Sequence, residues 1–359
     1  GLTPYGGVSN FGAVYKVSLP NTNFSLLHSF NGTNGRNPLG SLLQYGANLY
    51  GMTSLGGTND AGVIFRIGTN GSGYAVLHHF DGANANDGAT PWGALAESGG
   101  VLYGTTFNGG FTIRGVVFSI NPDGSGYVNL HRFVGGAGDG KHPKAGVLID
   151  GGKLYGTTSE GGADNAGVVF SMALNGSGYT NLCEFTGDAG NGMNPSAGVI
   201  KKGPYLFGTL HGVGTTAGSA FCVHTNGGTV NFMWFFSGTA ADGGDPFSAL
   251  VEHDSKVYGV TRYGGSNSAG TAYSLGAWKT NQYMWPEGGG EPIGGLIASG
   301  DVFYGTTLRG GVSNNGTLFR LEMNTNDGPT AWSAITWIDS GGMGETLAGD
   351  ENTRHMYVQ

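Results

Sequence analysis

The stretch "VLYGTTFNGG" at residues 101–110 decides the fold, because it recurs as "KLYGTTSEGG" at 153–162 and as "VFYGTTLRGG" at 302–311. Aligning the copies on the glycine that follows the tyrosine, or its substitute, gives seven repeats. They start at residues 1, 51, 104, 156, 208, 259 and 305. Self-similarity at a period of this length is typical of solenoids and propellers. We therefore expect a series of similar structural units.

One complete repeat, residues 91–133, contains four short runs that are typical of β-strands. They are "GALAE" (93–97), "VLYGTT" (101–106), "GVVFSI" (115–120) and "YVNLHRF" (127–133). Each run is rich in β-branched and aromatic residues and is bounded by turn residues, as in "NPDGSG" at 121–126. No segment shows the apolar period of a helix. We call the four runs a, b, c and d.

Four strands in about 50 residues describe one blade of a β-propeller. Run c is apolar on both of its faces, as at Val116, Val117 and Phe118, which suits a sheet covered on both sides by neighbouring blades. We predict an all-β fold, with residues 1–359 forming a single seven-bladed β-propeller of four-stranded antiparallel blades. An open β-solenoid is the alternative, and it would need capping repeats at its ends.

The two ends of the chain each carry part of one blade. The sequence starts with "GLT" (1–3), the end of a run b, and finishes with a run a, "ETLAG" (345–349), and most of a run b, "HMYVQ" (355–359). We expect these strands to share one blade and so close the propeller without open edges. Alternatively, the terminal strands complete a blade of a neighbouring molecule, which repeated head to tail gives a filament.

The composition excludes several classes of protein. Glycine accounts for 73 of the 359 residues, and charged residues make up 11%, against about 25% in an average domain. The net charge is −8 without a cluster of Lys and Arg, so we expect no nucleic-acid partner. No run of 18 apolar residues predicts a membrane span. Cys183 and Cys222 are too few for a disulfide scaffold and lack metal-ligand spacing. Low charge and many small polar residues favour a secreted or surface protein.

The repeat pattern also resembles a known family. The combination P-x-[AG]-x-L, LYGTT-x-x-GG, G-x-V-F and G-x-G-Y-x-x-L-H-x-F is similar to that of the GloVer tandem-repeat family, and it covers nearly the whole chain. The resemblance implies a bacterial propeller that is secreted or attached to the cell surface. It implies no activity, because no catalytic motif characterises the family.

The loops between runs b and c vary at the two positions before the glycine pair. These tips are Pro4-Tyr5, Ser54-Leu55, Phe107-Asn108, Ser159-Glu160, Arg262-Tyr263 and Leu308-Arg309. Variable loops on a constant scaffold are where binding residues concentrate, although drift at exposed tips would give the same pattern. We predict ligand-binding residues among them: Tyr5, Phe107, Glu160, Arg262, Tyr263 and Arg309, with aromatic side chains stacking on sugars.

Three neighbouring tips suggest a catalytic alternative. His211, Arg262, Tyr263 and Arg309 would form a basic and aromatic cluster in an acidic protein. Two arginines can bind a carboxylate, and a tyrosine or histidine beside them can abstract a proton. That is the chemistry of a polysaccharide lyase acting on uronic acids. The function we favour is non-enzymatic: an extracellular or cell-surface propeller for glycan or surface recognition, or a structural subunit of an extracellular assembly.

Two further sets of residues receive a structural interpretation. His28, His78 and His131 occupy the same place in run d, with Cys183 there in the fourth repeat, which indicates packing between blades. The d–a loops, such as "DGANANDG" (81–88), are rich in Asp and Asn. Ca2+ is the alternative ligand for such loops, but Asn, Asp and Gly are also ordinary turn residues. We predict no cofactor and no metal site.

Overall fold

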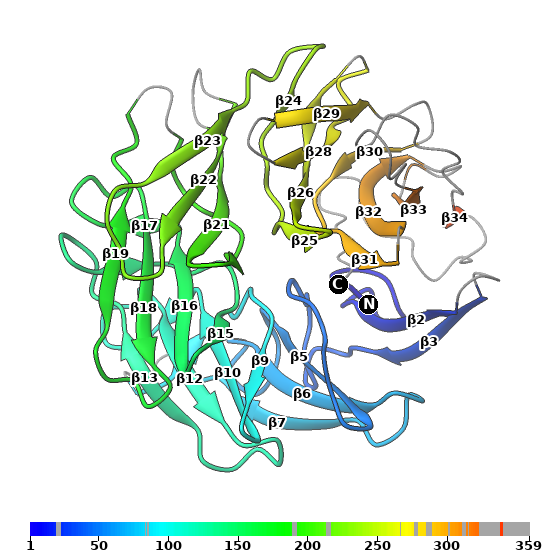
Figure 1. The fold of residues 1–359 in the computed structure, drawn as a ribbon. Helices are drawn as coiled ribbons and strands as arrows, with labels where there is room; N and C mark the ends of the chain where they lie inside the picture. The colour runs from blue at the N-terminus through cyan, green and yellow to red at the C-terminus, as the bar shows by residue number, and fades with distance from the viewer. Residues whose placement is uncertain are drawn as a thin grey trace. The chain divides into compact units, whose positions relative to one another are not determined.

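A computed structural model of the protein contains only β-strands as regular elements in the part of the chain that it describes (Figure 1). That part comprises residues 1–18, 23–82, 84, 86–188, 192–212, 217–265, 267–275, 279–284, 289–300, 302–310, 314, 316–322 and 338–339. The chain divides into two compact units. Of the described residues, those from 1 to 185 form the first and those from 186 to 339 form the second.

The first unit contains four large antiparallel sheets, one for each of the first four repeats. The first sheet has the order β1-β2-β3 (Leu2–Thr3, Ala13–Ser18, Asn23–Ser29). The second has β4-β5-β6-β7 (Leu43–Tyr45, Asn48–Thr53, Val63–Gly68, Ala75–His79). The third has β9-β10-β12-β13 (Ala96–Ser98, Val101–Thr106, Val116–Ile120, Val128–Arg132). The fourth has β15-β16-β18-β19 (Leu148–Asp150, Lys153–Thr158, Val168–Ala173, Thr180–Glu184).

The second unit contains the three sheets of the last repeats. The fifth sheet is β20-β21-β22-β23 (Ile200–Lys202, Tyr205–Leu210, Ser219–His224, Asn231–Phe235). The sixth is β25-β26-β28-β29 (Val251–His253, Lys256–Thr261, Thr271–Leu275, Lys279–Met284). The seventh contains β31, β32, β33 and β34 (Ile297–Ser299, Val302–Gly310, Thr317–Glu322, Ile338–Asp339). The strand order a-b-c-d is that of a propeller blade, so the prediction of an all-β, seven-bladed β-propeller is confirmed.

The blade that contains the N-terminal strands is described in part. The first sheet shows three strands, and the residues expected to complete it, 345–349 and 355–359, lie outside the described residues. Closure within one chain, and strand exchange between chains, therefore stay predictions. The expectation of a single domain also stays a prediction, and each unit is described by itself below.

The apolar cores lie between neighbouring blades of a unit. Tyr50, Met52 and Ile64 of the second blade pack with Leu102 and Phe118 of the third. Equivalent clusters join the first blade to the second, the third to the fourth, the fifth to the sixth and the sixth to the seventh. In blades that are packed on both sides, as the second, third and sixth are, strands b and c carry apolar residues on both faces, as the sequence predicts.

The constant "YGTT" of strand b is explained by its contacts. Gly104 pairs with Phe118 of strand c, and a Cβ atom at Gly104 would lie 2.5 Å from Cζ of that ring. The hydroxyl of Thr106 donates to the Asn108 carbonyl (2.6 Å) and accepts from the Val116 amide (3.3 Å), which fixes the turn into strand c. Glycine admits the buried ring, and threonine shapes the hairpin.

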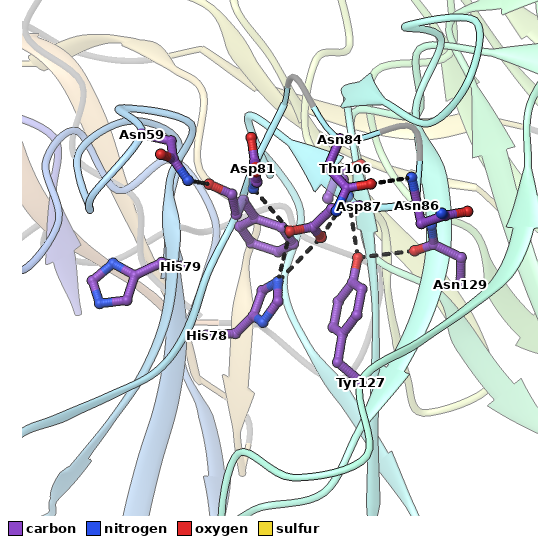
Figure 2. Close-up of polar contacts among 12 residues, drawn as sticks. Asn59, His78, His79, Asp81, Asn84, Asn86, Asp87, Thr106, Tyr127 and Asn129 are labelled. Atoms are coloured by element: carbon purple, nitrogen blue, oxygen red, sulfur yellow. Dashed lines mark hydrogen bonds and ion pairs between the residues drawn. The ribbon is translucent and has the colours of Figure 1, made fainter.

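A second repeated contact joins strand d of one blade to the next blade. In Figure 2 the His78 and Tyr127 rings lie beside the Asp87 carboxylate. The rings are stacked with centroids 4.1 Å apart, and Nε2 of His78 lies 3.1 Å from both Asp87 oxygens. Asp87 also accepts hydrogen bonds from the Asp81 and Gly88 amides (2.8 and 2.7 Å). We call this arrangement the His-Asp-Tyr clasp.

The clasp recurs with His131, Asp139 and Tyr179, where the rings are 3.8 Å apart and His131 lies 3.0 Å from Asp139. His28 likewise stacks on Tyr74. In the fourth blade Cys183 occupies the histidine position, opposite Val169 as His131 is opposite Val117. The interpretation of these residues as packing residues agrees with their contacts. Both cysteines are free thiols, and burial raises the pKa of Cys183 to about 12.

Candidate functional site

Four of the d–a loops pair with the following b–c hairpin in a ladder of a few residues, and two others are joined to it by a single bridge, between Arg36 and Leu55 and between Met193 and His211. In the first unit β8 (Gly88–Ala89) pairs with β11 (Asn108–Gly109), and β14 (Gly140–Lys141) pairs with β17 (Glu160–Gly161). In the second unit β24 (Gly243–Gly244) pairs with β27 (Tyr263–Gly264), and β30 (Gly289–Pro292) pairs with β32. The variable hairpin tips therefore lie against the d–a loops, on the same side of each blade.

This pairing between loop and hairpin places a second variable position, in the d–a loop, beside each hairpin tip. It is the residue before a recurring proline, and its backbone is left-handed in every copy. The copies are Asn37, Thr90, His142, Asn194, Asp245 and Glu291, with φ of 54°, 53°, 55°, 57°, 57° and 55°. This conformation is unfavourable for residues other than glycine, and more so before proline. It persists only where other contacts fix it.

Backbone hydrogen bonds supply those contacts. The Asp245 amide donates to the Ala217 carbonyl (2.6 Å), and the Asp245 carbonyl accepts from the Arg262 amide (3.0 Å). Thr90 bonds in the same way to Ala61 (2.7 Å) and to Phe107 (3.1 Å). The main chain therefore sets the position of these side chains, whichever residue type is present.

In the second unit, these positions form a chain of alternating charges. His211 is hydrogen-bonded through Nδ1 to Asp245, whose other oxygen lies 3.7 Å from Nη1 of Arg262. Arg262 reaches Oε2 of Glu291 at 3.4 Å, and Nε of Arg309 reaches Oε1 of the same Glu291 at 2.8 Å. Asp245 is buried and Arg309 is exposed, so the chain runs from the protein interior toward solvent.

Tyr263 adds an aromatic surface beside this chain of charges. A Cβ atom at Gly244 would lie 2.3 Å from Cε2 of the tyrosine ring, and one at Gly238 would lie 2.9 Å from the same atom. The ring therefore rests on glycine backbone, while 38% of the residue stays exposed. Burial, and the nearby charge of Asp245, raise the pKa of Tyr263. At neutral pH its hydroxyl is protonated and can donate a hydrogen bond.

The structure thus brings together all four residues of the predicted catalytic cluster, His211, Arg262, Tyr263 and Arg309. It also adds two carboxylates, Asp245 and Glu291, that the sequence interpretation missed. The sequence does mark these two positions, because the residue before the recurring proline varies from repeat to repeat, as the hairpin tips do. It was overlooked because sequence spacing alone does not show that a d–a loop pairs with a hairpin.

The added carboxylates change the chemistry expected of the cluster. Both arginines are already bound to Glu291, and His211 is bound to Asp245. The positive charges of Arg262 and Arg309 are also balanced by the negative charges of Asp245 and Glu291. Toward solvent, the donors Arg262 and Arg309 alternate with the acceptor Glu291, which suits hydroxyl groups, since each hydroxyl can donate and accept. A pocket for a uronic-acid carboxylate would instead need a guanidinium group free of such partners.

The other predicted ligand-binding residues lie in the first unit. The Phe107 ring is stacked between Trp92 and His142, with centroids 4.4 and 4.6 Å apart. Glu160 forms an ion pair with Lys141 at 2.9 Å. Tyr5 is half-buried at the first tip. Both faces of the Phe107 ring are covered by neighbouring rings, and the role of these three residues in ligand binding stays a prediction.

In the Asp-rich d–a loops, the carboxylates of Asp87, Asp139 and Asp242 are buried in the protein. Asp87 and Asp139 belong to the clasps, and Asp242 accepts hydrogen bonds from the Ser237 and Gly243 amides (2.9 and 2.8 Å). Within the residues that the structure describes, no group of three or more His, Cys, Asp or Glu side chains is arranged to hold a metal. In the same residues, no helix is long and apolar enough to cross a membrane.

The blades and their junctions define the class of protein: a tandem-repeat β-propeller with a constant framework and variable residues at each junction. The sequence matches the Gloeobacter/Verrucomicrobia repeat over residues 1–147, 95–284 and 191–353. The chain therefore belongs to that repeat family, which confirms the resemblance drawn from its motifs. No similar curated protein is found by sequence.

Solved structures support the fold. A Bacteroides uniformis protein, provisionally assigned as a 6-phosphogluconolactonase, is 13% identical with a TM-score of 0.56, over 94% of each chain. A Bacteroides fragilis protein with the same provisional assignment is 14% identical with a TM-score of 0.53, over 94% of this chain and 93% of that one. A puromycin-hydrolyzing peptidase of Mycobacterium tuberculosis is 11% identical with a TM-score of 0.56, over 88% of this chain and 48% of that one. At these identities the likeness concerns the fold alone.

Proposed function

We propose that the sixth and seventh blades carry a binding site for a neutral sugar chain, and that the protein acts outside the cytoplasm in non-enzymatic glycan recognition. The observation that carries this proposal is the Tyr263 ring, held on the backbone of Gly244 and Gly238 and partly open to solvent. An aromatic ring with one rigidly supported face offers the other for stacking at little entropic cost.

The charges around Tyr263 support a neutral ligand. Arg262 and Glu291 are partners in an ion pair, and each still has hydrogen-bonding capacity toward solvent. Hydroxyl groups of a sugar can bond to both without separating the pair. The extracellular location is supported by the glycine-rich, weakly charged composition.

The test is a comparison of variants on a glycan array and by titration with the retained glycan. Tyr263→Ala should weaken binding about tenfold, which corresponds to about 1.4 kcal/mol. Tyr263→Phe keeps the ring and should bind within about threefold of the native protein. Tyr205→Ala is the matched control, since Tyr205 is 39% exposed on β21. Unchanged binding by Tyr263→Ala, or no glycan retained by the native protein, would contradict the proposal.

The lyase alternative has its own readout. Uronic-acid polymers treated with the protein should show no rise in ultraviolet absorbance, because a lyase product contains a new C=C bond. Glu291→Gln removes the carboxylate that binds both arginines and should shift binding toward carboxylated sugars. A steady rise in absorbance with the native protein would establish the lyase instead.

A further inference from the structure

The b–c hairpin of the third blade has two large, exposed apolar residues at its tip, one of them at a position that is Asn, Asp or Ser in the other hairpins, whereas the first hairpin exposes Val8 and Phe11. Phe111 is 81% exposed and Ile113 is 63% exposed. The second and fourth hairpins carry Thr58 and Ala163 where the third has Phe111, and Asp60 and Asn165 where it has Ile113. Exposed apolar side chains grouped at one tip indicate an interaction site.

The backbone at Ile113 makes this exposure unusual. Its φ is 58°, in the left-handed region, as at Asn10, Asp60, Asn165, Ser268 and Asn314 of the other hairpins. Asn and Asp tolerate this conformation, whereas a β-branched residue is strained in it. At Asp60 and Asn165 the side chain also accepts a hydrogen bond from the first glycine of the pair (2.8 and 3.2 Å). Ile113 is strained, and its side chain cannot form that bond.

The tip is nevertheless held firmly in place. The Thr112 hydroxyl donates to the Phe133 carbonyl (2.6 Å), and the Ile113 amide donates to the Gly110 carbonyl (3.2 Å). Next to Phe133, Val134 is also 51% exposed. A strained apolar residue that gains no burial inside the protein points to a role toward a partner.

Basic side chains surround this apolar tip. The guanidinium group of Arg114 and the stem of Lys141 lie against Gly135, and Arg132 is exposed at the end of β13. The charge of Lys141 is paired with Glu160 (2.9 Å), so Arg114 and Arg132 carry the basic character of the tip. The acids between 107 and 144 are Asp123 in the c–d turn and the buried Asp139. In a protein of net charge −8, this tip is therefore locally basic.

We propose that the third hairpin tip binds an anionic lipid surface, with Phe111 and Ile113 entering the headgroup region and the basic side chains contacting lipid phosphates. A projecting tip with two apolar side chains fits a fluid interface better than the flat surface of a protein partner. Each Lys or Arg near an anionic bilayer adds to the attraction, and salt screens it. This site is independent of the sugar site proposed above.

The experiment is co-sedimentation of the protein with vesicles of phosphatidylcholine containing about 30% phosphatidylserine, at low and high salt, beside vesicles of phosphatidylcholine alone. The native protein should bind the anionic vesicles at low salt and dissociate as salt rises. Ile113→Asn should reduce the partition coefficient about tenfold. Because an asparagine side chain at this position can accept the missing hydrogen bond, the same substitution should raise Tm by about 1–2 °C.

Val128→Asn is the matched control, since Val128 is 52% exposed on the same blade but lies in β13 outside the tip. It should bind vesicles as the native protein does. Equal binding to both kinds of vesicle, no binding, or undiminished binding by Ile113→Asn would overturn the proposal. So would a dimer, seen by sedimentation velocity without lipid, that Ile113→Asn dissociates, because the tip would then join two copies of this chain.

Discussion

At the scale of single residues, glycine in strand b shows how closely sequence and packing are linked. The aromatic ring of strand c lies over this glycine in repeat after repeat: Gly51 meets Phe65, Gly156 meets Phe170, and Gly305 meets Phe319. The glycine of "LYG" is thus constant because a buried ring occupies the space of its missing side chain. The sequence interpretation recognised the repeat but could not identify this partner, since it lies about 14 residues away on another strand.

Gly104→Ala should therefore destabilise the protein by about 2–3 kcal/mol, through overpacking against Phe118. Urea denaturation followed by fluorescence would measure the loss. Adding Phe118→Leu should recover part of it, because the smaller side chain makes room for the methyl group. Gly295→Ala is the control, since a Cβ atom there meets its nearest neighbour only at 3.7 Å. Equal effects of the two alanine substitutions would refute the explanation.

At the scale of elements, the His-Asp-Tyr clasp shows how one blade is joined to the next. Asp87 lies in the d–a loop, His78 is the next-to-last residue of the preceding strand d (β7), and Tyr127 directly precedes strand d (β13) of the following blade. The structural role of the histidines was predictable from their recurrence. Their Asp and Tyr partners were not, because a glycine- and Asn-rich loop does not reveal which of its carboxylates turns inward.

Asp87→Asn should destabilise the protein by about 2–3 kcal/mol, since an amide cannot accept all the hydrogen bonds that the buried carboxylate receives. Combined with His78→Ala, the loss should be less than the sum of the two, because both residues belong to one network. Asp123→Asn, in an exposed c–d turn, serves as the control and should change stability by under about 0.5 kcal/mol. Additive losses in the double variant would argue against the clasp.

At the scale of the whole molecule, buried and hydrogen-bonded carboxylates predict sensitivity to acid. Burial alone would raise the pKa of Asp139, but hydrogen bonds from His131 and the Val134 amide outweigh it and hold the pKa below its usual value. A carboxyl group whose pKa is lower in the folded state stabilises the protein above the unfolded pKa of about 4, and this contribution is lost as the pH falls below it.

We expect the free energy of unfolding to decrease as the pH is lowered from about 5 to about 2, with a smaller decrease in Asp139→Asn. Urea titrations at each pH would measure both curves. Glu160 and Glu184, whose pKa values are also lowered, should contribute to the slope that remains in the variant. Parallel curves for the two proteins would show that Asp139 does not titrate as proposed.

The fold was largely predictable, whereas the site was predictable only in part. The length of the repeat, its four β-like runs and its turn residues together predict propeller blades, because all three can be recognised in the local sequence. The tips Arg262, Tyr263 and Arg309 could be identified by their variation. Asp245 and Glu291 could not be placed beside them without the ladder between loop and hairpin, which is a tertiary contact. That contact is the reason we propose a neutral ligand here, and not the carboxylate of the lyase alternative.

The residue before each proline has a further consequence. Its backbone is fixed by main-chain hydrogen bonds to both adjoining loops, as at Asp245, and these bonds do not depend on its side chain. Thr, His, Asn, Asp and Glu all occur there in one chain. Gene duplication and recombination between repeats could therefore exchange one junction for another while the framework still folds. A protein built in this way can acquire new specificities during evolution by reassorting repeats that it already contains.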